Sequence, residues 1–540
     1  MASRMGRERP MGRSLTRFPP AQQTTPASEW RAEWLWLTLI VAYAVVVRSY
    51  NLTEPWGRHQ LGINGAWQSH IARNFLRYGF IATHGAPVLN SSAGLPETWS
   101  YYLHHPPLVF WLLALSFDLL GVYEWSARLP TLGFALLCVV LTHRLARRLL
   151  GSPAALVAAA VTAAVPMSAI YSMHVDVTGP FVLAFVLLAV NAYARLAERR
   201  YRHGCTMLAA VLVGCLADWP AFYLPPLLFA HQLTRPRSDR SPAVRWTLGA
   251  SAVLAGGLLL YFDLLQGGLG EQVHQLRVRT AHLQDDVGQG FTVVAWLQVT
   301  VARFWQLYTP PLALAVCCWV VAASLRWARG RLHPADTYVW LLLAFGTATL
   351  LVAFQAAYQH ESAAYYLTPA ASLCAAEVVS AVWLQATQRL PHRLAVAIAA
   401  TLALTLATWW GAVSIARPQA QRRQLDAEFG YAAADLGRVV RDHTAPGEGA
   451  IVAENWCPPA LWFYAERPLV PIMTTVETLR EDLDRPRYRA PECFAETADE
   501  PIGAVVVPKA LLPRAGRLVE FLRARFQAHE DGEFIVFRVR

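Results

Sequence analysis

Ionisable residues stand at several points where the chain leaves a long apolar run, and these residues could do chemistry. Asp176, Glu361 and His105 carry a carboxylate or an imidazole, either of which can take a proton from a hydroxyl group. A charged group at the end of an apolar run is costly, so it indicates function unless it caps a helix. We predict that these three residues are catalytic, with Asp176 the leading candidate.

The composition indicates that these residues belong to a membrane protein. Of the 540 residues, 55% are apolar and only 16% are charged, which is hard to reconcile with a water-soluble protein. The net charge of +10 could suggest a nucleic-acid partner. The basic residues, however, are almost all Arg and cluster between apolar runs, a pattern that orients membrane proteins. We therefore expect no nucleic-acid partner.

The apolar runs predict about eleven membrane crossings. Runs of roughly 17 to 25 residues can cross the hydrocarbon layer. They begin near Trp34, Leu129, Pro153, Thr178, Trp246, Pro310, Tyr338, Ala363 and Leu394, and two shorter runs flank Asp218. Six Arg clusters share the cytoplasmic side only if Pro106 to Gly121 does not fully cross, so we interpret this segment as a re-entrant or juxtamembrane helix. The N-terminus is then cytoplasmic and the C-terminus lies outside.

The chain divides by composition into three parts. Residues 1–32 are rich in Arg and Pro without an apolar stretch, and we predict a disordered basic cytoplasmic segment. Residues 33–416 form the membrane module, whose first outer loop covers residues 50–105. Residues 417–540 have the pattern of a small soluble α/β domain on the outer side. Its strands are expected at 450–453, 469–472, 503–507 and 533–538, and its helices at 459–466, 476–483 and 517–526.

The first outer loop holds three short motifs in a fixed order. Residues 62–79 place Trp67, Ile71, Phe75 and Tyr78 at helical spacing, which predicts an amphipathic helix on the outer membrane surface, closed by Gly79. His105-Pro106-Pro107-Leu108 follows, at the point where the chain turns back toward the membrane. Ala127-Arg128-Leu129-Pro130 then opens the next crossing.

The order, side and spacing of these motifs resemble the polytopic GT-C class of glycosyltransferases, over about residues 30 to 230. The resemblance is strongest to the branch of protein O-mannosyltransferases and lipid A aminoarabinose transferases. It implies a mainly α, polytopic integral membrane protein of GT-C architecture, here with a small C-terminal α/β extracytoplasmic domain. It also implies transfer of a sugar from a polyprenyl phosphate, dolichyl or undecaprenyl, to an acceptor on the outer face.

One position departs from the family pattern. The family opens its surface helix with an acidic pair that activates the acceptor or holds a metal, and this pair falls on Asn64 and Gly65. Asp176 matches the position of the second acidic residue of the family. The remaining polar residues on the outer side are expected to bind substrate, although Arg and Tyr at interfaces also have purely structural roles. They are Asn64, Arg73, His104, Arg128, Asp218, His360 and Tyr102.

The expected ligands follow from the same resemblance. The donor is a polyprenyl-phosphate sugar, the surrounding partners are membrane lipids, and the acceptor is unknown. No cofactor is expected, and a divalent metal has no support because the acidic pair of the first loop is missing. The sequence contains no Cys or His spacing typical of a structural zinc site.

Two other functions stay open at this point. A catalytically degenerate relative that serves in an assembly would explain Asn64 directly. A lipid or solute transporter would be expected to carry inverted repeats and ionisable residues near the middle of the membrane. No repeat is found, and the polar residues gather at one face of the membrane, with Asp263 and Glu377 among the few exceptions. A bacterial inner membrane is the expected location, with the active face toward the outside.

Overall fold

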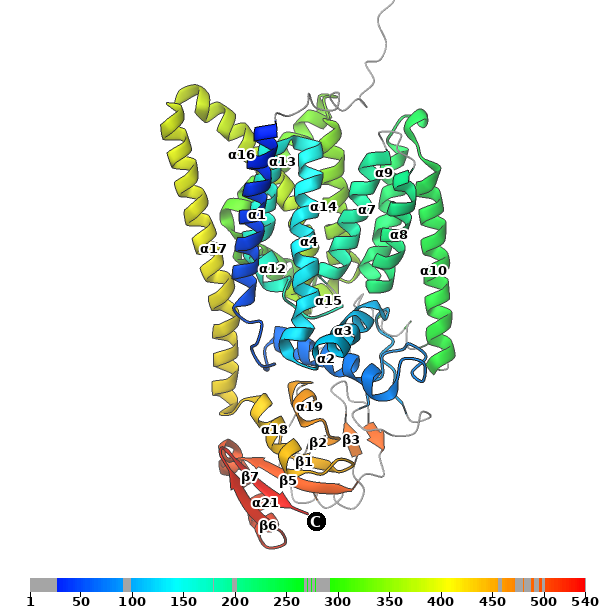
Figure 1. Cartoon of the computed structure of the whole chain (residues 1–540), viewed down its shortest axis with the longest axis vertical. Coiled ribbons are helices and arrows are strands. Elements are labelled where there is room, and N and C mark those ends of the chain that lie inside the picture. Colours follow the sequence, from blue (N-terminus) through cyan, green and yellow to red (C-terminus); the bar gives the residue numbers. More distant parts are fainter. Residues whose placement is uncertain are drawn as a thin grey trace, which may run out of the picture.

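The computed structural model describes most of the chain as one helical bundle, a layer of crosswise helices beneath it and an α/β unit below that layer (Figure 1). The described residues are 27–90, 99–177, 179–196, 202–266, 292–454, 459–471, 487–489, 495–497 and 501–539, with the single positions 270, 273, 277 and 479. The predictions made for residues 1–26 and for a helix at 476–483 lie outside them, apart from position 479.

Seven helical stretches in the described residues are long and apolar enough to cross a membrane. They are formed by α1 (Ala27–Ser49), α4 (Glu124–Leu150), α10 (Pro242–Gln266), α12 to α13 (Val293–Ala328), α14 (Pro334–Val352), η5 with α16 (Glu361–Arg389) and α17 (His392–Phe429). The stretch of α12 (Val293–Arg303), η4 (Phe304–Tyr308) and α13 (Thr309–Ala328) includes one π-helical turn. The chain is thus a multi-pass membrane protein, and the count of eleven crossings stays a prediction.

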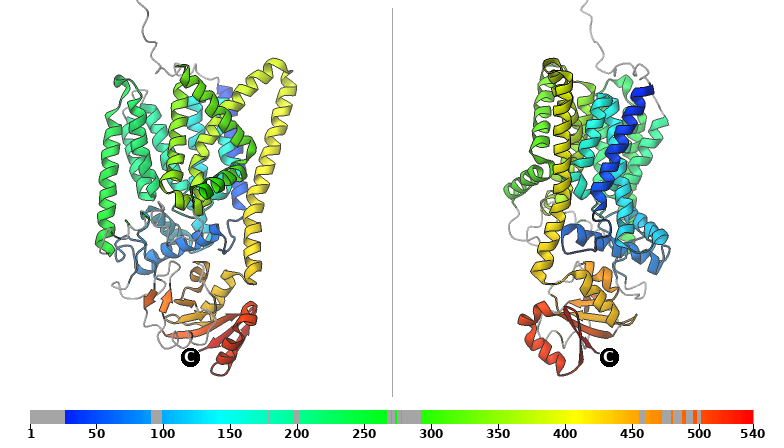
Figure 2. Two further views of the ribbon diagram at one scale, coloured as in Figure 1. Left: turned by 180° about the vertical axis from the view of Figure 1, so that it is seen from behind. Right: turned by 60° about the vertical axis from the view of Figure 1, so that its left-hand side comes forward.

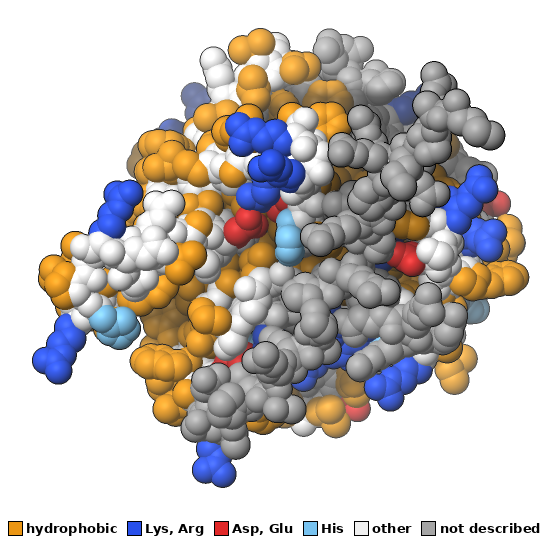
Figure 3. Space-filling view, turned by 90° about the horizontal axis from the view of Figure 1, so that it is seen from above, with side chains coloured by type: hydrophobic (Ala, Val, Ile, Leu, Met, Phe, Trp, Pro, Cys, Tyr) orange, Lys and Arg blue, Asp and Glu red, His pale blue; other side chains and the backbone are white. Residues whose placement is uncertain are grey.

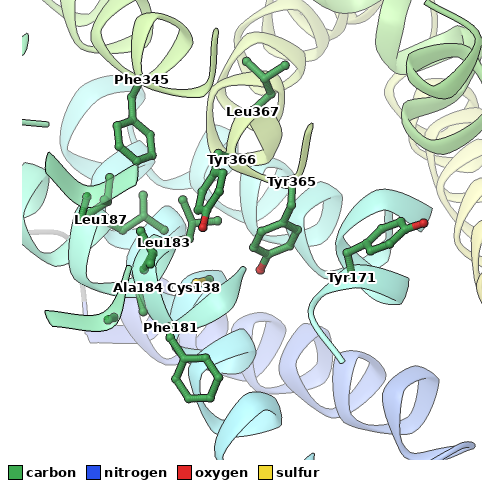
Figure 4. Close-up of a cluster of buried hydrophobic side chains, with 14 of the residues drawn as sticks. Cys138, Tyr171, Phe181, Leu183, Ala184, Leu187, Phe345, Tyr365, Tyr366 and Leu367 are labelled. Carbon is green, nitrogen blue, oxygen red and sulfur yellow. The ribbon is translucent and has the colours of Figure 1, made fainter. Parts of the chain in front are cut away.

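Shorter apolar helices complete the bundle. They are α5 (Ser152–Ala164), α6 (Pro166–Tyr171), α7 (Pro180–Leu196), α8 (Arg202–Ala217) and α9 (Leu224–Leu233), with η2 (Trp219–Tyr223), η3 (Arg237–Asp239) and α15 (Phe354–Gln359) as connections. α7 packs against both α4 and α8, and α5 lies between α4 and α16. In the core, Phe345 of α14 packs against Tyr366 of η5, and Phe181 and Leu183 of α7 belong to the same cluster of buried side chains (Figure 4). α10 and α17 leave large apolar side chains exposed, as lipid contact requires.

Basic side chains gather at the end of the bundle where α1 begins. Seen from that end, Lys and Arg side chains lie around the rim, over hydrophobic side chains (Figure 3). Arg147 and Arg148 occupy the last turn of α4, and Arg326 occupies the last turn of α13. The predicted grouping of all six Arg clusters on one side, and the orientation in a membrane, stay predictions.

Two helices lie crosswise at the opposite end of the bundle, α2 (Gln60–Tyr78) and α3 (Leu108–Leu120) (Figures 1 and 2). α2 ends at Gly79, whose positive φ of 86° is available to glycine at little cost. α3 packs on α2 and α4. The predicted surface helix and the predicted helix after His105 are therefore both present, stacked on one another.

The C-terminal part is an α/β unit on the side of α2 and α3. It contains α18 (Ala433–His443), β1 (Gly449–Val452), α19 (Pro459–Ala465), β2 (Leu469–Pro471), β3 (Arg487–Arg489), β4 (Ala495–Thr497), β5 (Ile502–Pro508), η6 (Lys509–Leu511), α21 (Leu512–Arg523), β6 (Gln527–Asp531) and β7 (Phe534–Arg538). Five strands form a sheet in the order β2-β1-β5-β7-β6. β1 runs parallel to β2 and β5, and β7 runs antiparallel to β5 and β6.

Two predicted boundaries differ from the structure. α1 begins at Ala27, so residues 27–32 are helical although the sequence predicts disorder to residue 32. α17 is a single helix from His392 to Phe429, and the predicted boundary at residue 417 falls inside it. The helix ends at Gly430, whose φ of 75° allows the left-handed turn into the α/β unit.

Candidate active site

Asp176 lies in the turn between α6 and α7, buried beneath α2. Asn64 Nδ2 donates a hydrogen bond to its Oδ2 at 2.9 Å, and Gln68 Nε2 donates to its Oδ1 at 3.2 Å. The backbone N–H of Val177 also donates to Oδ1, at 2.7 Å. Asn64 and Gln68 are four residues apart in α2, so both amides lie on one face of that helix. The carboxylate thus joins the first outer loop to the bundle.

The charge state of Asp176 follows from these contacts. Burial acts to raise its pKa, but His174, His105 and His360 and the Val177 N–H together hold the pKa below its usual value. Asp176 is therefore an anion at neutral pH that already accepts hydrogen bonds at both oxygens. Such a carboxylate fixes geometry and charge well and is a weak proton acceptor.

His105 and Asp218 form a second buried pair close by. His105 Nδ1 lies 2.7 Å from Asp218 Oδ1, and the two side chains are only 8% and 1% exposed. The backbone N–H of Trp219 donates to the same oxygen at 2.8 Å, because Asp218 caps the start of η2. The ring of Tyr102 stacks on the His105 ring at a centroid distance of 5.9 Å. The Trp219 indole donates to the carbonyl of His104 at 2.7 Å.

Glu361 begins η5 and is held by three groups. It accepts a short hydrogen bond from the hydroxyl of Tyr171. Arg417 Nη2 lies 3.0 Å from both carboxylate oxygens, and Arg303 Nε lies 4.0 Å from Oε1. The neighbouring His360 accepts a hydrogen bond from Gln60 of α2 at 2.9 Å.

A cavity of about 270 Å³ opens beside Glu361, between α17, α6 and the start of α2. Its polar walls include Arg58, His59, Gln60, Glu361 and Arg417. Burial, with the charges of Arg422 and Arg128, lowers the pKa of His59 to about 4, so this wall residue is neutral at neutral pH. The volume is near the lower end of the roughly 300–1,000 Å³ of small-molecule sites. A compact polar ligand matches that size.

Arg73 and Arg128 make their contacts elsewhere. Arg73 Nη1 donates to the carbonyl of Phe463 in α19 at 2.9 Å. Arg128 Nη1 donates to the carbonyls of Leu52 and Glu54 at 2.8 and 2.6 Å, and its guanidinium lies 4.1 Å from the Trp56 ring centroid. Arg73 therefore joins α2 to the α/β unit, and Arg128 joins α4 to the start of the first outer loop. Their predicted role in substrate binding stays a prediction.

The structure adds several residues to those predicted from sequence. Gln68 could have been found from its place one turn after Asn64 on the same helix face. Arg417 lies in the C-terminal half of α17, outside the six Arg clusters that are predicted to be cytoplasmic, and this position was a signal in the sequence. Tyr171 carries no signal in the sequence, because its role depends on the approach of Glu361, 190 residues later.

The donor set around Asp176 does not make a metal site. Asn64 faces the carboxylate with its amide nitrogen, which is a hydrogen-bond donor and not a metal ligand. Across the described ranges, no three His, Cys, Asp or Glu side chains are grouped so as to hold a metal ion. Metal independence stays a prediction, and no chemical step is assigned here to a metal.

Comparisons with known proteins agree with the resemblance predicted from the sequence. The family model described as dolichyl-phosphate-mannose-protein mannosyltransferase matches residues 104–261, a range that contains His105, Asp176 and Asp218. No curated protein sequence matches the chain. The matched range thus includes the His105–Asp218 pair and Asp176, and it excludes Asn64 and Gln68, the partners of Asp176 in α2.

Two solved structures share the fold over nearly the whole chain. ArnT from Cupriavidus metallidurans, bound to undecaprenyl phosphate, has a TM-score of 0.56 at 14% identity, over 95% of this chain and 98% of that one. The oligosaccharyltransferase AglB from Archaeoglobus fulgidus, in complex with an inhibitory peptide and a dolichol-phosphate, has a TM-score of 0.55 at 12% identity, over 95% of this chain and 75% of that one. The predicted GT-C architecture is confirmed.

Proposed function

We propose that this chain is a membrane glycosyltransferase that moves a sugar from a polyprenyl-phosphate donor to an acceptor on the outer face of the membrane. The observation that carries the proposal is the buried polar centre of Asp176, Asn64, His105 and Asp218 beneath α2. Burying ionisable groups in a membrane protein costs free energy, so such groups are rare and usually functional. Their clustering at one end of the bundle therefore supports a reaction there.

The chemistry of the donor agrees with the charges near this centre. A lipid phosphate is a good leaving group that needs cationic stabilisation more than it needs a proton. Arg417 lies in the wall of the cavity, and Arg303 is 4.0 Å from Glu361. A phosphate that enters the cavity would meet Arg417 and Arg58 in its wall, while the apolar outer surface of α17 is suited to the lipid chain.

Location and sugar are parts of the same proposal. We propose that the protein lies in the inner membrane, with the start of α1 in the cytoplasm and the α/β unit outside. The transferred group is a hexose or a pentose, and the acceptor is a glycan, a lipid or a protein.

The test is sugar transfer from radiolabelled polyprenyl-phosphate sugars by the purified protein in lipid, with and without a chelator. Asp176→Asn is expected to lower the rate by about 10²-fold or more, because it removes the negative charge that faces the reacting groups. The matched control is Asp239→Asn in η3, near the opposite end of the bundle, which should keep the wild-type rate. Transfer by the wild type is expected to survive chelation.

The degenerate alternative has one observation in its favour, the amide of Asn64 at the position of a family carboxylate. It predicts no transfer from any donor by well-folded wild-type protein, although polyprenyl phosphate would still bind. That result would overturn the proposed function.

A further inference from the structure

We propose that His105 and Asp218 form the acid–base pair of this enzyme, in which His105 removes the proton from the acceptor hydroxyl group. The inference rests on the proposed function and assigns the proton to a group other than the carboxylate of Asp176.

The two carboxylates predicted to be catalytic are poorly placed to take a proton. Both oxygens of Asp176 accept hydrogen bonds, from Asn64 and Gln68, in addition to the Val177 N–H. Glu361 is engaged by the Tyr171 hydroxyl and by Arg417 at 3.0 Å. A proton on either carboxyl group would break charge-assisted hydrogen bonds, which are the stronger kind.

The contacts of His105 are those of a positioned base. Asp218 lies 2.7 Å from Nδ1 and is an acceptor, so the proton of the neutral imidazole is on Nδ1 and the lone pair is on Nε2. Stacking on Tyr102 fixes the plane of the ring. Asp218 itself is fixed by the Trp219 N–H, so neither member of the pair needs to reorganise when the proton arrives.

Two buried carboxylates lie near the imidazole of His105. Asp218 is 1% exposed, and among the described residues its Oδ2 has no hydrogen-bond partner. Asp176, in the α6–α7 turn, is close enough to His105 for their charges to interact. Tyr366 of η5 faces both carboxylates, and His104 precedes His105 in the chain. The imidazolium that forms when His105 takes the proton would therefore lie beside the carboxyl groups of Asp218 and Asp176.

The acceptor oxygen forms a bond to C1 of the donor sugar while its proton passes to His105 Nε2. The bond between C1 and the phosphate oxygen breaks, and its electron pair leaves with the lipid phosphate. The imidazolium is stabilised by Asp218 and Asp176 until the proton passes to the released phosphate or to water.

The experiment measures kcat and KM for donor and acceptor across pH, with the full-length protein in lipid. Asp218→Asn is expected to lower kcat by about 10²-fold or more, the usual contribution of a positioned acid or base, with donor KM changed by less than about threefold. The acidic limb of its pH–rate profile should move to lower pH, because the imidazole loses a neighbouring negative charge. Asp218→Glu, which keeps the carboxylate, should hold the limb near its wild-type position.

A second variant separates base catalysis from phosphate binding. His105→Lys places a cation at the position, which can bind phosphate, but supplies no neutral base near neutral pH, so we expect a loss in kcat of about 10²-fold or more. If His105 only binds the donor phosphate, this variant keeps its kcat. The matched control is His392→Gln at the exposed start of α17, which should be unchanged.

The outcomes are distinguishable. If the wild type transfers sugar while His105→Lys and Asp218→Asn keep kcat within a few-fold and the pH limb does not move, the assignment is overturned and the proposed function stands. If the wild type transfers no sugar, the proposed function is overturned and the assignment with it.

Discussion

At the scale of single residues, the hydrogen bond from Asn64 to Asp176 stabilises the ionised form of the buried carboxylate. Asn64→Asp places two carboxylates at a distance of 2.9 Å, where both cannot be ionised without strong repulsion. One of the two carboxyl groups then has a raised pKa in the folded state, so stability is lost as the pH rises through that value. Relative to wild type, we expect the variant to lose about 1–3 kcal/mol more at about pH 8 than at about pH 5.

The control for this prediction is Asn64→Ala, which removes the same hydrogen bond and adds no charge. Its loss of stability should be equal at the two pH values, as measured by thermal unfolding in lipid nanodiscs. The paired carboxylates of Asn64→Asp should also attract a divalent cation, so Mn²⁺ is expected to raise the unfolding temperature of this variant and not that of the wild type. Equal pH dependence for the two variants would contradict the argument.

Asp176, at the centre of this site, could be predicted from the sequence, but its hydrogen-bond partners could not. Asp176 could be identified because a lone carboxylate between two apolar runs is costly. Its partners Asn64 and Gln68 lie 112 and 108 residues away in the sequence, and Asp218 lies 113 residues from His105. No local pattern encodes such pairings, because they depend on how α2, α7 and α8 pack.

At the scale of elements, α2 packs its own backbone against the segment before it. A Cβ on Gly65 would lie 2.2 Å from a ring carbon of Trp56, which is 2% exposed. Trp56 cannot move easily, because its backbone N–H donates to Tyr464 at 2.8 Å and Arg128 covers its ring. Gly65, which stands at the second position of the acidic pair in the surface helix of the family, therefore has no room for any side chain in this chain.

We expect Gly65→Ala to lower the free energy of unfolding by about 1–3 kcal/mol, as overpacking of a filled core does. Trp56→Leu in the same chain should recover part of this loss, which gives a double-mutant cycle with a clear coupling. Gly133→Ala in α4 is the matched control, because nothing lies within 4 Å of its added Cβ, and alanine is the better helix former. Additive losses in the cycle would argue against the packing explanation.

Elements with a strong local pattern were predicted well. The amphipathic helix at 62–79 is α2 (Gln60–Tyr78), and the strands at 503–507 and 533–538 are β5 (Ile502–Pro508) and β7 (Phe534–Arg538). β6 (Gln527–Asp531) was not predicted, because four of its five residues are exposed and polar or small, so neither face has an apolar signal. It is a strand because it pairs with β7 at the edge of the sheet.

At the scale of the whole molecule, one buried ion pair joins the α/β unit to the first outer loop. Arg58 Nη2 lies 3.0 Å from Glu454 Oε1, and the two side chains are 2% and 3% exposed. Arg58 also donates to the carbonyl of Tyr431 at 2.8 Å and lies over the ring of Phe429, 4.2 Å from its centroid. Because Arg58 lines the cavity beside Glu361, this contact links the α/β unit to the proposed donor site.

Glu454→Ala should therefore affect both stability and the site. It leaves the charge of Arg58 buried without its partner, and breaking such a pair costs about 3–5 kcal/mol. The control is Asp435→Ala, which breaks the pair of Asp435 with Arg438, whose side chains are 59% and 43% exposed. Exposed pairs contribute about 0–1 kcal/mol, so this variant should unfold like the wild type.

Limited proteolysis gives the second readout, since release of the α/β unit exposes the chain near Gly430 to cleavage. Equal unfolding temperatures and equal cleavage rates for the two variants would mean that other contacts, such as that of Arg73 with α19, hold the unit in place.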